Sequence, residues 1–207
     1  MATIVNEYVI ITSGEAGPPG VQGDPGAPGA PGLDGTTAGR HTLWIPSYAM
    51  TPRLTDGAAD HEEELATNFV MIKALDFDPD TDQYAQFMVS FPKSWDEGVV
   101  QAEFHWKGPA GAGDVVWALQ GAARNDGEAL DAAFGGAQFA SDTFQGADIE
   151  HRTATTSGIT VAGTPADGSL VVFQVARLAS NGGDTYNQLA TLLGVRLFFT
   201  TDAENDD

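Results

Sequence analysis

The hydrophobic and polar positions after residue 40 follow the pattern of short β-strands. In the run Val99–Trp106, apolar and polar side chains alternate, so the two faces of this segment differ in character. Turns rich in Gly, Pro, Asn and Asp recur about every 10–15 residues, a spacing typical of an antiparallel sandwich. The predicted strands cover residues 41–46, 68–77, 83–91, 99–108, 114–124, 158–163, 170–178 and 194–201.

This pattern predicts an all-β protein whose residues 40–202 form a jelly-roll-like β-sandwich head. Trp44, Trp106 and Trp117 lie within strand-like runs, so we expect all three to be buried. One stretch, residues 126–140, has Ala, Leu and Phe at helical spacing and predicts a short helix in a loop.

The front of the chain carries a different repeat. Between residues 14 and 37, glycine occupies every third position for eight consecutive Gly-X-Y units, with proline at five X or Y positions. Only glycine fits at the axis where three polyproline-II chains wind together, so the spacing predicts a collagen-like triple helix about 70 Å long, and hence a homotrimer. The repeating glycines are Gly14, Gly17, Gly20, Gly23, Gly26, Gly29, Gly32 and Gly35.

Residues 1–13 precede this rod and contain aliphatic side chains typical of a strand or an extended peptide. A segment this short cannot fold alone, so we expect it to attach to sister chains or to another protein. The expected anchor residues are Ile4, Val5, Val9, Ile10 and Ile11. The segment lacks the basic region and cleavage site of a signal peptide, so we expect no secretory address.

Charge and composition narrow the class of partner. The chain has 29 acidic and 9 basic residues, a net charge of −20, and an acidic tail at residues 203–207. Nucleic acids and anionic membrane surfaces are excluded, because both require clustered Lys and Arg. No apolar run is long enough to span a bilayer, so we expect no membrane insertion. The absence of cysteine excludes disulfides and thiolate metal ligands.

Alternating carboxylates in the stretch DFDPDTD form a candidate calcium site. Asp residues at every second position can place oxygen ligands around Ca²⁺, although the glycine and the bidentate glutamate of an EF-hand are missing. A solvated turn between two strands is the alternative, and we favour it. No other cofactor is indicated. The four carboxylates are Asp76, Asp78, Asp80 and Asp82.

Trp95 is the candidate aromatic residue for binding a ligand. It lies in the turn KSWDEG beside Asp96 and Glu97, where an exposed indole can stack on a sugar while carboxylates bind the hydroxyl groups. The alternative is that Trp95 anchors the turn. His61 in DHEEE also lies beside carboxylates, but it lacks a second histidine at helical spacing, so we interpret this run as a charged loop.

No catalytic motif occurs in the sequence. It contains no G-x-S-x-G, no phosphate loop, no HExxH and no interpretable pair of carboxylates for glycoside hydrolysis. We therefore expect a binding or structural protein and not an enzyme.

The order of short apolar segment, Gly-X-Y rod and β-rich head resembles the collagen-containing fibre proteins of tailed bacteriophages. The head also resembles a domain recurrent in phages and prophages of marine alphaproteobacteria. The resemblance implies a trimeric virion protein, assembled in the host cytoplasm, with residues 1–13 docked on another phage protein and the head outward. It identifies no ligand. The segments that carry it are HTLWIPSYAMTPRLTDGA (41–58), FPKSWDEG (91–98), VVWALQG (115–121) and GVRLFFTTDA (194–203).

Three functions stay open on these grounds. The first is a short phage fibre whose three heads bind a host-surface glycan or protein with the avidity of a trimer. The second is a capsid decoration or tail-attached spike protein without a specific receptor. The third is a secreted cellular ligand of the same architecture, which the missing signal peptide and disulfides disfavour.

Overall fold

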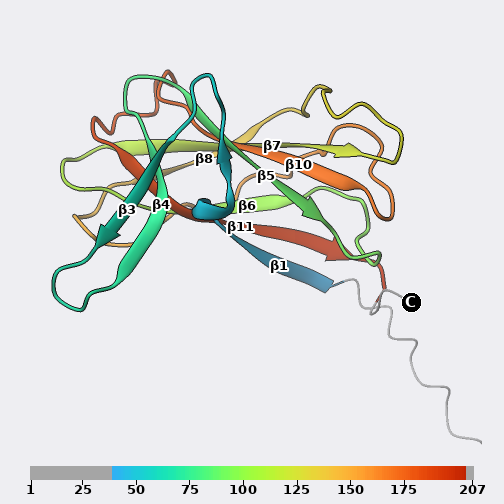
Figure 1. The fold of residues 1–207 in the computed structure, drawn as a ribbon, viewed down its shortest axis with the longest axis horizontal. Coiled ribbons are helices and arrows are strands. Elements are labelled where there is room, and N and C mark those ends of the chain that lie inside the picture. Colours follow the sequence, from blue (N-terminus) through green and yellow to red (C-terminus); the bar gives the residue numbers. More distant parts are fainter. Residues whose placement is uncertain (1–38, 204–207) are drawn as a thin grey trace, which may run out of the picture. The chain divides into compact units, whose positions relative to one another are not determined.

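Two antiparallel sheets face each other across a hydrophobic core (Figure 1). This computed structural model describes residues 39–203. Three predicted segments lie outside the described residues: the anchor at residues 1–13, the rod at residues 14–37 and the tail beyond residue 203. What we expect of them stays a prediction. Within the described part, the predicted all-β sandwich is confirmed.

The first sheet has the strand order β3-β4-β11-β6-β9, and β1 also pairs with β11. Strands β4 and β1 pair with the same edge of β11 at different positions. β4 pairs with Ala190–Leu192, and β1 pairs with Gly194–Thr201. The bounds are β1 (Gly39–Pro46), β3 (Ala59–Glu64), β4 (Met71–Phe77), β6 (Gln101–Lys107), β9 (His151–Arg152) and β11 (Ala190–Thr201).

The second sheet has the order β2-β5-β10-β7-β8. Its long central strands match the sequence closely, since residues 114–124 form β7 as predicted. The bounds are β2 (Thr51–Pro52), β5 (Gln83–Ser90), β7 (Asp114–Arg124), β8 (Gln138–Thr143) and β10 (Leu170–Arg177).

Two sequence expectations about elements were wrong. Residues 158–163 form no strand and contribute only isolated bridges through Ile159 and Ala162. Residues 126–140 form no helix: the segment runs through turns and bends into β8, and the Arg124 guanidinium donates hydrogen bonds to the carbonyls of Leu130 and Ala132 in it. Among residues 39–203 the only helical element is the short 3-10 helix η1 (Ser47–Ala49), and no helix there could cross a membrane.

The core fills the space between the two sheets with alternate strand residues. Trp106 and Trp117 are fully buried, as predicted, and the Trp117 indole meets the Phe77 ring edge-on with 5.0 Å between ring centroids. An ion pair is also buried, with 2.8 Å between Arg177 Nη2 and Asp184 Oδ1. Arg177 donates further bonds to backbone carbonyls, so its charge is fully compensated inside the protein.

Trp44 is not buried, contrary to prediction, because 48% of its surface is exposed. Side chains alternate along β1, and its neighbours Leu43 and Ile45 pack against the core. Trp44 therefore points to the outer face of the first sheet.

Candidate functional site

A row of polar side chains crosses three strands on the outer face of the first sheet. Thr191 of β11 lies opposite Lys107 of β6 on one side and opposite Asp76 of β4 on the other. The adjacent residues Leu75 and Trp106 are buried in the core. Since successive side chains point to opposite faces of a sheet, the three polar side chains face outward together.

The edge strand β3 adds two more polar groups to this row. Ala59 pairs with Asp76, so His61 and Glu63, two and four residues further on, project from the same face. The distance from His61 Nδ1 to Asp76 Oδ2 is 2.9 Å, and Glu63 accepts a hydrogen bond from Lys107.

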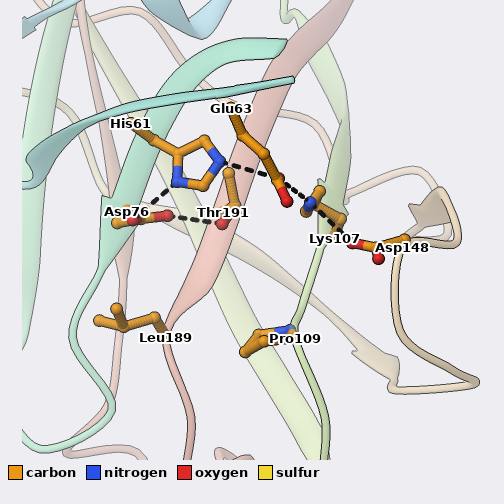
Figure 2. A pocket seen from close by; sticks show the side chains of 8 residues that line it. All are labelled: His61, Glu63, Asp76, Lys107, Pro109, Asp148, Leu189 and Thr191. Atoms are coloured by element: carbon orange, nitrogen blue, oxygen red, sulfur yellow. Dashed lines mark hydrogen bonds and ion pairs between the residues drawn. The ribbon is translucent and has the colours of Figure 1, made fainter. Parts of the chain in front are cut away.

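These groups surround a cavity of about 260 Å³, shown in Figure 2. We call it the polar pocket. Its volume lies near the lower end of the range of small-molecule binding sites. The residues that line it are His61, Glu63, Asp76, Lys107, Pro109, Asp148, Leu189 and Thr191.

One continuous chain of hydrogen bonds orders the side chains of the polar pocket. Thr191 Oγ1 donates to Asp76 Oδ1 at 2.5 Å, and Asp76 also contacts His61. His61 Nε2 lies 3.3 Å from Glu63 Oε2. Lys107 Nζ joins Glu63 to Asp148, whose Oδ1 is 2.8 Å away. The pocket is thus preorganised before any ligand enters it (Figure 2).

The charged state of the pocket is set by Lys107 and its two carboxylate partners. The hydrogen bond from Lys107 lowers the pKa of Glu63 below its ordinary range. Burial pulls the pKa of Lys107 down, but the hydrogen bonds to Asp148 and Glu63 outweigh this effect, and its pKa is raised. Both groups therefore stay charged at neutral pH. Three carboxylates and one ammonium line the pocket, so its Asp, Glu and Lys side chains carry an excess of negative charge.

Trp44 lies on the same outer face and contacts His105, which is two residues from Lys107 along β6. Its indole meets the His105 ring edge-on, with 5.0 Å between ring centroids. His105 and Lys107 are two residues apart on β6 and therefore point to the same side. An aromatic surface and a polar cavity are thus neighbours on one sheet.

His105 is almost fully buried beneath this surface. Its Nδ1 lies 2.6 Å from Glu150 Oε1, while its Nε2 has no hydrogen-bond partner within the part of the chain that the structure describes. An unpaired buried polar atom of this kind costs free energy.

The carboxylates of the predicted calcium site do not converge. Asp76 belongs to the polar pocket, Asp78 accepts a hydrogen bond from the Asp80 amide, and Asp82 accepts bonds from the Ser180 amide and hydroxyl. No group of three or more His, Asp or Glu side chains within residues 39–203 is arranged to hold a metal ion. The structure therefore gives no geometric support to calcium at this turn.

The expectation of an exposed Trp95 was wrong. Its side chain is only 5% exposed and packs on the Phe91 ring, with 4.3 Å between ring centroids. Its indole faces cannot reach a sugar, and the alternative that Trp95 anchors the turn is correct. The neighbouring Asp96 caps the turn by accepting a hydrogen bond from the Gly98 amide. Glu97 has a positive φ of 57° within the same turn.

The charged run DHEEE was also misassigned, since it forms most of strand β3 and not a loop. Charged side chains are compatible with an edge strand, where they discourage pairing with other chains. The signal in the sequence was the period of two, because His61 and Glu63 alternate with the exposed Glu62 and Glu64. Lys107 and Thr191 are far away in sequence, and no local pattern linked them to this strand.

Comparisons with known proteins give fold-level likeness only. No protein-family model and no curated protein matches the sequence. Among solved structures, a family 11 carbohydrate-binding module from Clostridium thermocellum, in complex with a β-1,3-1,4-mixed-linked tetrasaccharide, has a TM-score of 0.36 and 11% identity. The alignment covers 80% of this chain and 91% of that one.

A second solved structure is the carbohydrate-binding module TmCBM27, described for specific mannan recognition. It has a TM-score of 0.32 and 10% identity, and the alignment covers 76% of this chain and 88% of that one. At these values no ligand and no site residue is carried over from either protein.

Proposed function

We propose that the sandwich is the receptor-binding head of a trimeric phage fibre and that it binds a host-surface glycan on the outer face of its first sheet. The observation that carries this proposal is that the half-exposed Trp44 contacts His105, two residues along β6 from Lys107 of the polar pocket. An indole stacks on the apolar face of a sugar ring, and fixed carboxylate and ammonium groups bind its hydroxyl groups.

The position of the pocket within the head supports a receptor-binding role. The chain enters the head at Gly39, which pairs with Thr201 at one end of β11, while Thr191 at the other end lines the pocket. The ten steps of strand between these two threonines span about 30 Å. In Figure 1, β3 and β4 accordingly lie at the opposite end of the sandwich from the start of β1. A ligand site far from the entry point is accessible on a displayed head.

The charge of the pocket favours neutral or amine-bearing sugars. Its excess of carboxylates over ammonium groups repels a uronic or sialic acid, whereas a hydroxyl or an ammonium group can donate to Asp76, Asp148 and Glu63. The sole ammonium, Lys107, is already paired with two carboxylates and offers little to an anionic ligand.

The same electrostatics favour binding over catalysis. A general acid or base works best when its pKa lies near the working pH. The pKa of Glu63 is shifted down and that of Lys107 is shifted up, both away from neutrality. Neither group is tuned for proton transfer.

A glycan array bearing neutral, amino and acidic sugars tests the proposal with the full-length protein. We expect binding to neutral or amino sugars and not to acidic ones. Trp44→Ala is expected to weaken binding about 10-fold or more, because the stacking surface is lost. Phe139→Ala is the matched control, since Phe139 is 61% exposed on the other sheet and its loss leaves binding unchanged.

A folding control separates binding from stability. Trp95→Ala removes a buried indole and is expected to lower the free energy of unfolding by about 3–5 kcal/mol while the remaining folded protein still binds. Absence of binding to every class on the array, or equal binding by the wild type and Trp44→Ala, would contradict the proposed glycan site.

The fibre role has a separate test. A receptor-binding fibre adsorbs to bacterial host cells, and an excess of the purified protein blocks infection. A capsid decoration protein binds isolated capsids through residues 1–13 and leaves infection unaffected. Binding to neither cells nor particles would exclude both virion roles.

A further inference from the structure

We propose that the three heads contact one another through the end of the outer sheet face where the chain enters, with a second copy of this chain as the partner. We call this surface the entry face and define it by Arg40, Val99, Gln101, Phe198 and Thr200, which line one shallow hollow together with Phe199. The inference rests on the trimer of the proposed function. It adds which surface of each head forms the contact between copies.

The length of chain before the head limits where the heads can meet. The last glycine of the predicted rod is Gly35, and the first strand of the head begins at Gly39. In the proposed trimer, four residues span at most about 14 Å, so each Gly39 is tethered within that distance of the end of the predicted rod. A domain of this size has a radius of gyration of about 15 Å, so three such domains tethered this closely meet near their entry points.

The residues around Gly39 place the entry face at this meeting point. Arg40 pairs with Thr200 across β1 and β11, and Phe198 pairs with Gln101 across β11 and β6. Val99 lies two residues before Gln101 and so projects on the same outer side. Strands β1, β11 and β6 thus carry four of these residues beside the entry point, and Val99 lies just before β6.

The chemistry of the entry face suits burial against another copy. Val99 is 53% exposed, and the Arg40 guanidinium lies over the Phe198 ring, 3.9 Å from its centroid. A stacked arginine on an aromatic ring beside an exposed aliphatic side chain is a common composition for the centre of a protein interface.

Charge complementarity around a three-fold axis supports the same surface. Arg40 forms no ion pair with any residue of the described chain, and neither Asp96 nor Glu97 in the turn beside Thr200 does so. In a head-to-tail ring, Arg40 of one copy can pair with an acidic residue of the next. This pairing also relieves part of the repulsion between chains that each carry a net charge of −20.

Single-cysteine cross-linking tests the entry face, because the natural chain contains no cysteine. Val99→Cys, Thr200→Cys, Leu130→Cys and Phe139→Cys are made in the full chain and treated with a short bismaleimide. We expect covalent dimers as the main product for the first two variants and monomers for the last two. Leu130 and Phe139 are exposed but belong to the second sheet and its loop.

The outcomes distinguish the surface from the proposed function. Cross-linking at Leu130 or Phe139 but not at Val99 and Thr200 would overturn the entry face and place the contact on the second sheet. A trimer by sedimentation with no cross-linking at any site would also overturn it, while leaving the fibre intact. A monomer by sedimentation would remove both the trimer and the entry face. Retained glycan binding by the cross-linked Val99→Cys protein would show that the polar pocket stays open.

Discussion

The role of each aromatic side chain was decided by which face of its strand or turn it occupies. Trp44 and Trp95 exchanged the roles that sequence reasoning gave them. Trp44, in an apolar run, is half exposed because Leu43 and Ile45 take the inward positions. Trp95, in a charged turn, is buried against Phe91. Local polarity around a tryptophan is therefore a poor guide to its exposure, since one residue of register reverses the direction of a side chain.

Replacing Glu63 with Gln should change the pH dependence of stability. Because its pKa is lowered in the folded state, the ionised Glu63 stabilises the protein above its ordinary value of 4.5, and this contribution disappears as the pH falls through the folded-state pKa. About a third of the side chain is exposed, so solvent limits the effect to at most about 1 kcal/mol, or about 2–4 °C in melting temperature.

Melting curves recorded between about pH 3 and about pH 8 check this prediction. Glu63→Gln should melt below the wild type near neutral pH and match it at the acid end. Glu62→Gln, an exposed neighbour on β3, serves as the control and should follow the wild type throughout. A constant difference at all pH values would mean that the carboxylate charge is not what stabilises the pocket.

At the level of elements, close approach between β1 and β11 depends on Gly194. A Cβ atom built there would lie 2.4 Å from Cζ2 of Trp44 and 2.7 Å from the Ile45 carbonyl oxygen. Glycine therefore allows the indole to lie over this part of β11 and reach His105. The bulge between Leu192 and Gly194 also falls where the partner of β11 changes from β4 to β1.

Gly194→Ala should displace Trp44 and destabilise the protein by about 1–3 kcal/mol, the usual cost of overpacking. We also expect weaker glycan binding, because the indole loses its position beside the polar pocket. Chemical denaturation and glycan titration measure the two effects. Gly182→Ala is the matched control, since a Cβ atom there meets nothing within 4 Å. Unchanged stability and binding in Gly194→Ala would show that Trp44 is free to move.

At the level of the whole molecule, the entry point of the chain and the polar pocket lie at opposite ends of the head. The entry point at Gly39 and the end of β11 lie together, since Gly39 pairs with Thr201. The polar pocket lies at the start of β11, near Thr191. In the proposed fibre this arrangement leaves one end for contacts between heads and the other for the receptor.

Gly26→Leu should break the rod without unfolding the head. A leucine side chain cannot fit at the axis of a triple helix, so we expect loss of the trimer by sedimentation and an unchanged melting temperature of the head. Affinity for a soluble sugar should be retained, whereas avidity for a glycan-coated surface should fall about 100-fold or more. Ala27→Leu, in an outward X position, is the control. Loss of head folding would show that the rod and the head are not independent.

Much of the strand content could be predicted from the sequence. The run DVVWALQGAAR gave the bounds of β7 without error, because long buried strands have a strong local signal of apolar residues. The weak elements were missed for the opposite reason. β3 is mostly charged, and β2 and β9 have two residues each. Such strands are stable only through their pairing with neighbours that lie elsewhere in the chain.

The sequence by itself determined the all-β character of the head, the period-of-two pattern of its long strands and the acidic balance of its charge. These properties are local or compositional. Only the tertiary structure decided the candidate site, because His61, Asp76, Lys107 and Thr191 meet through the pairing of four strands. Strand register is a long-range property, and it determined that Trp44 points outward, while packing of the turn on Phe91 buried Trp95.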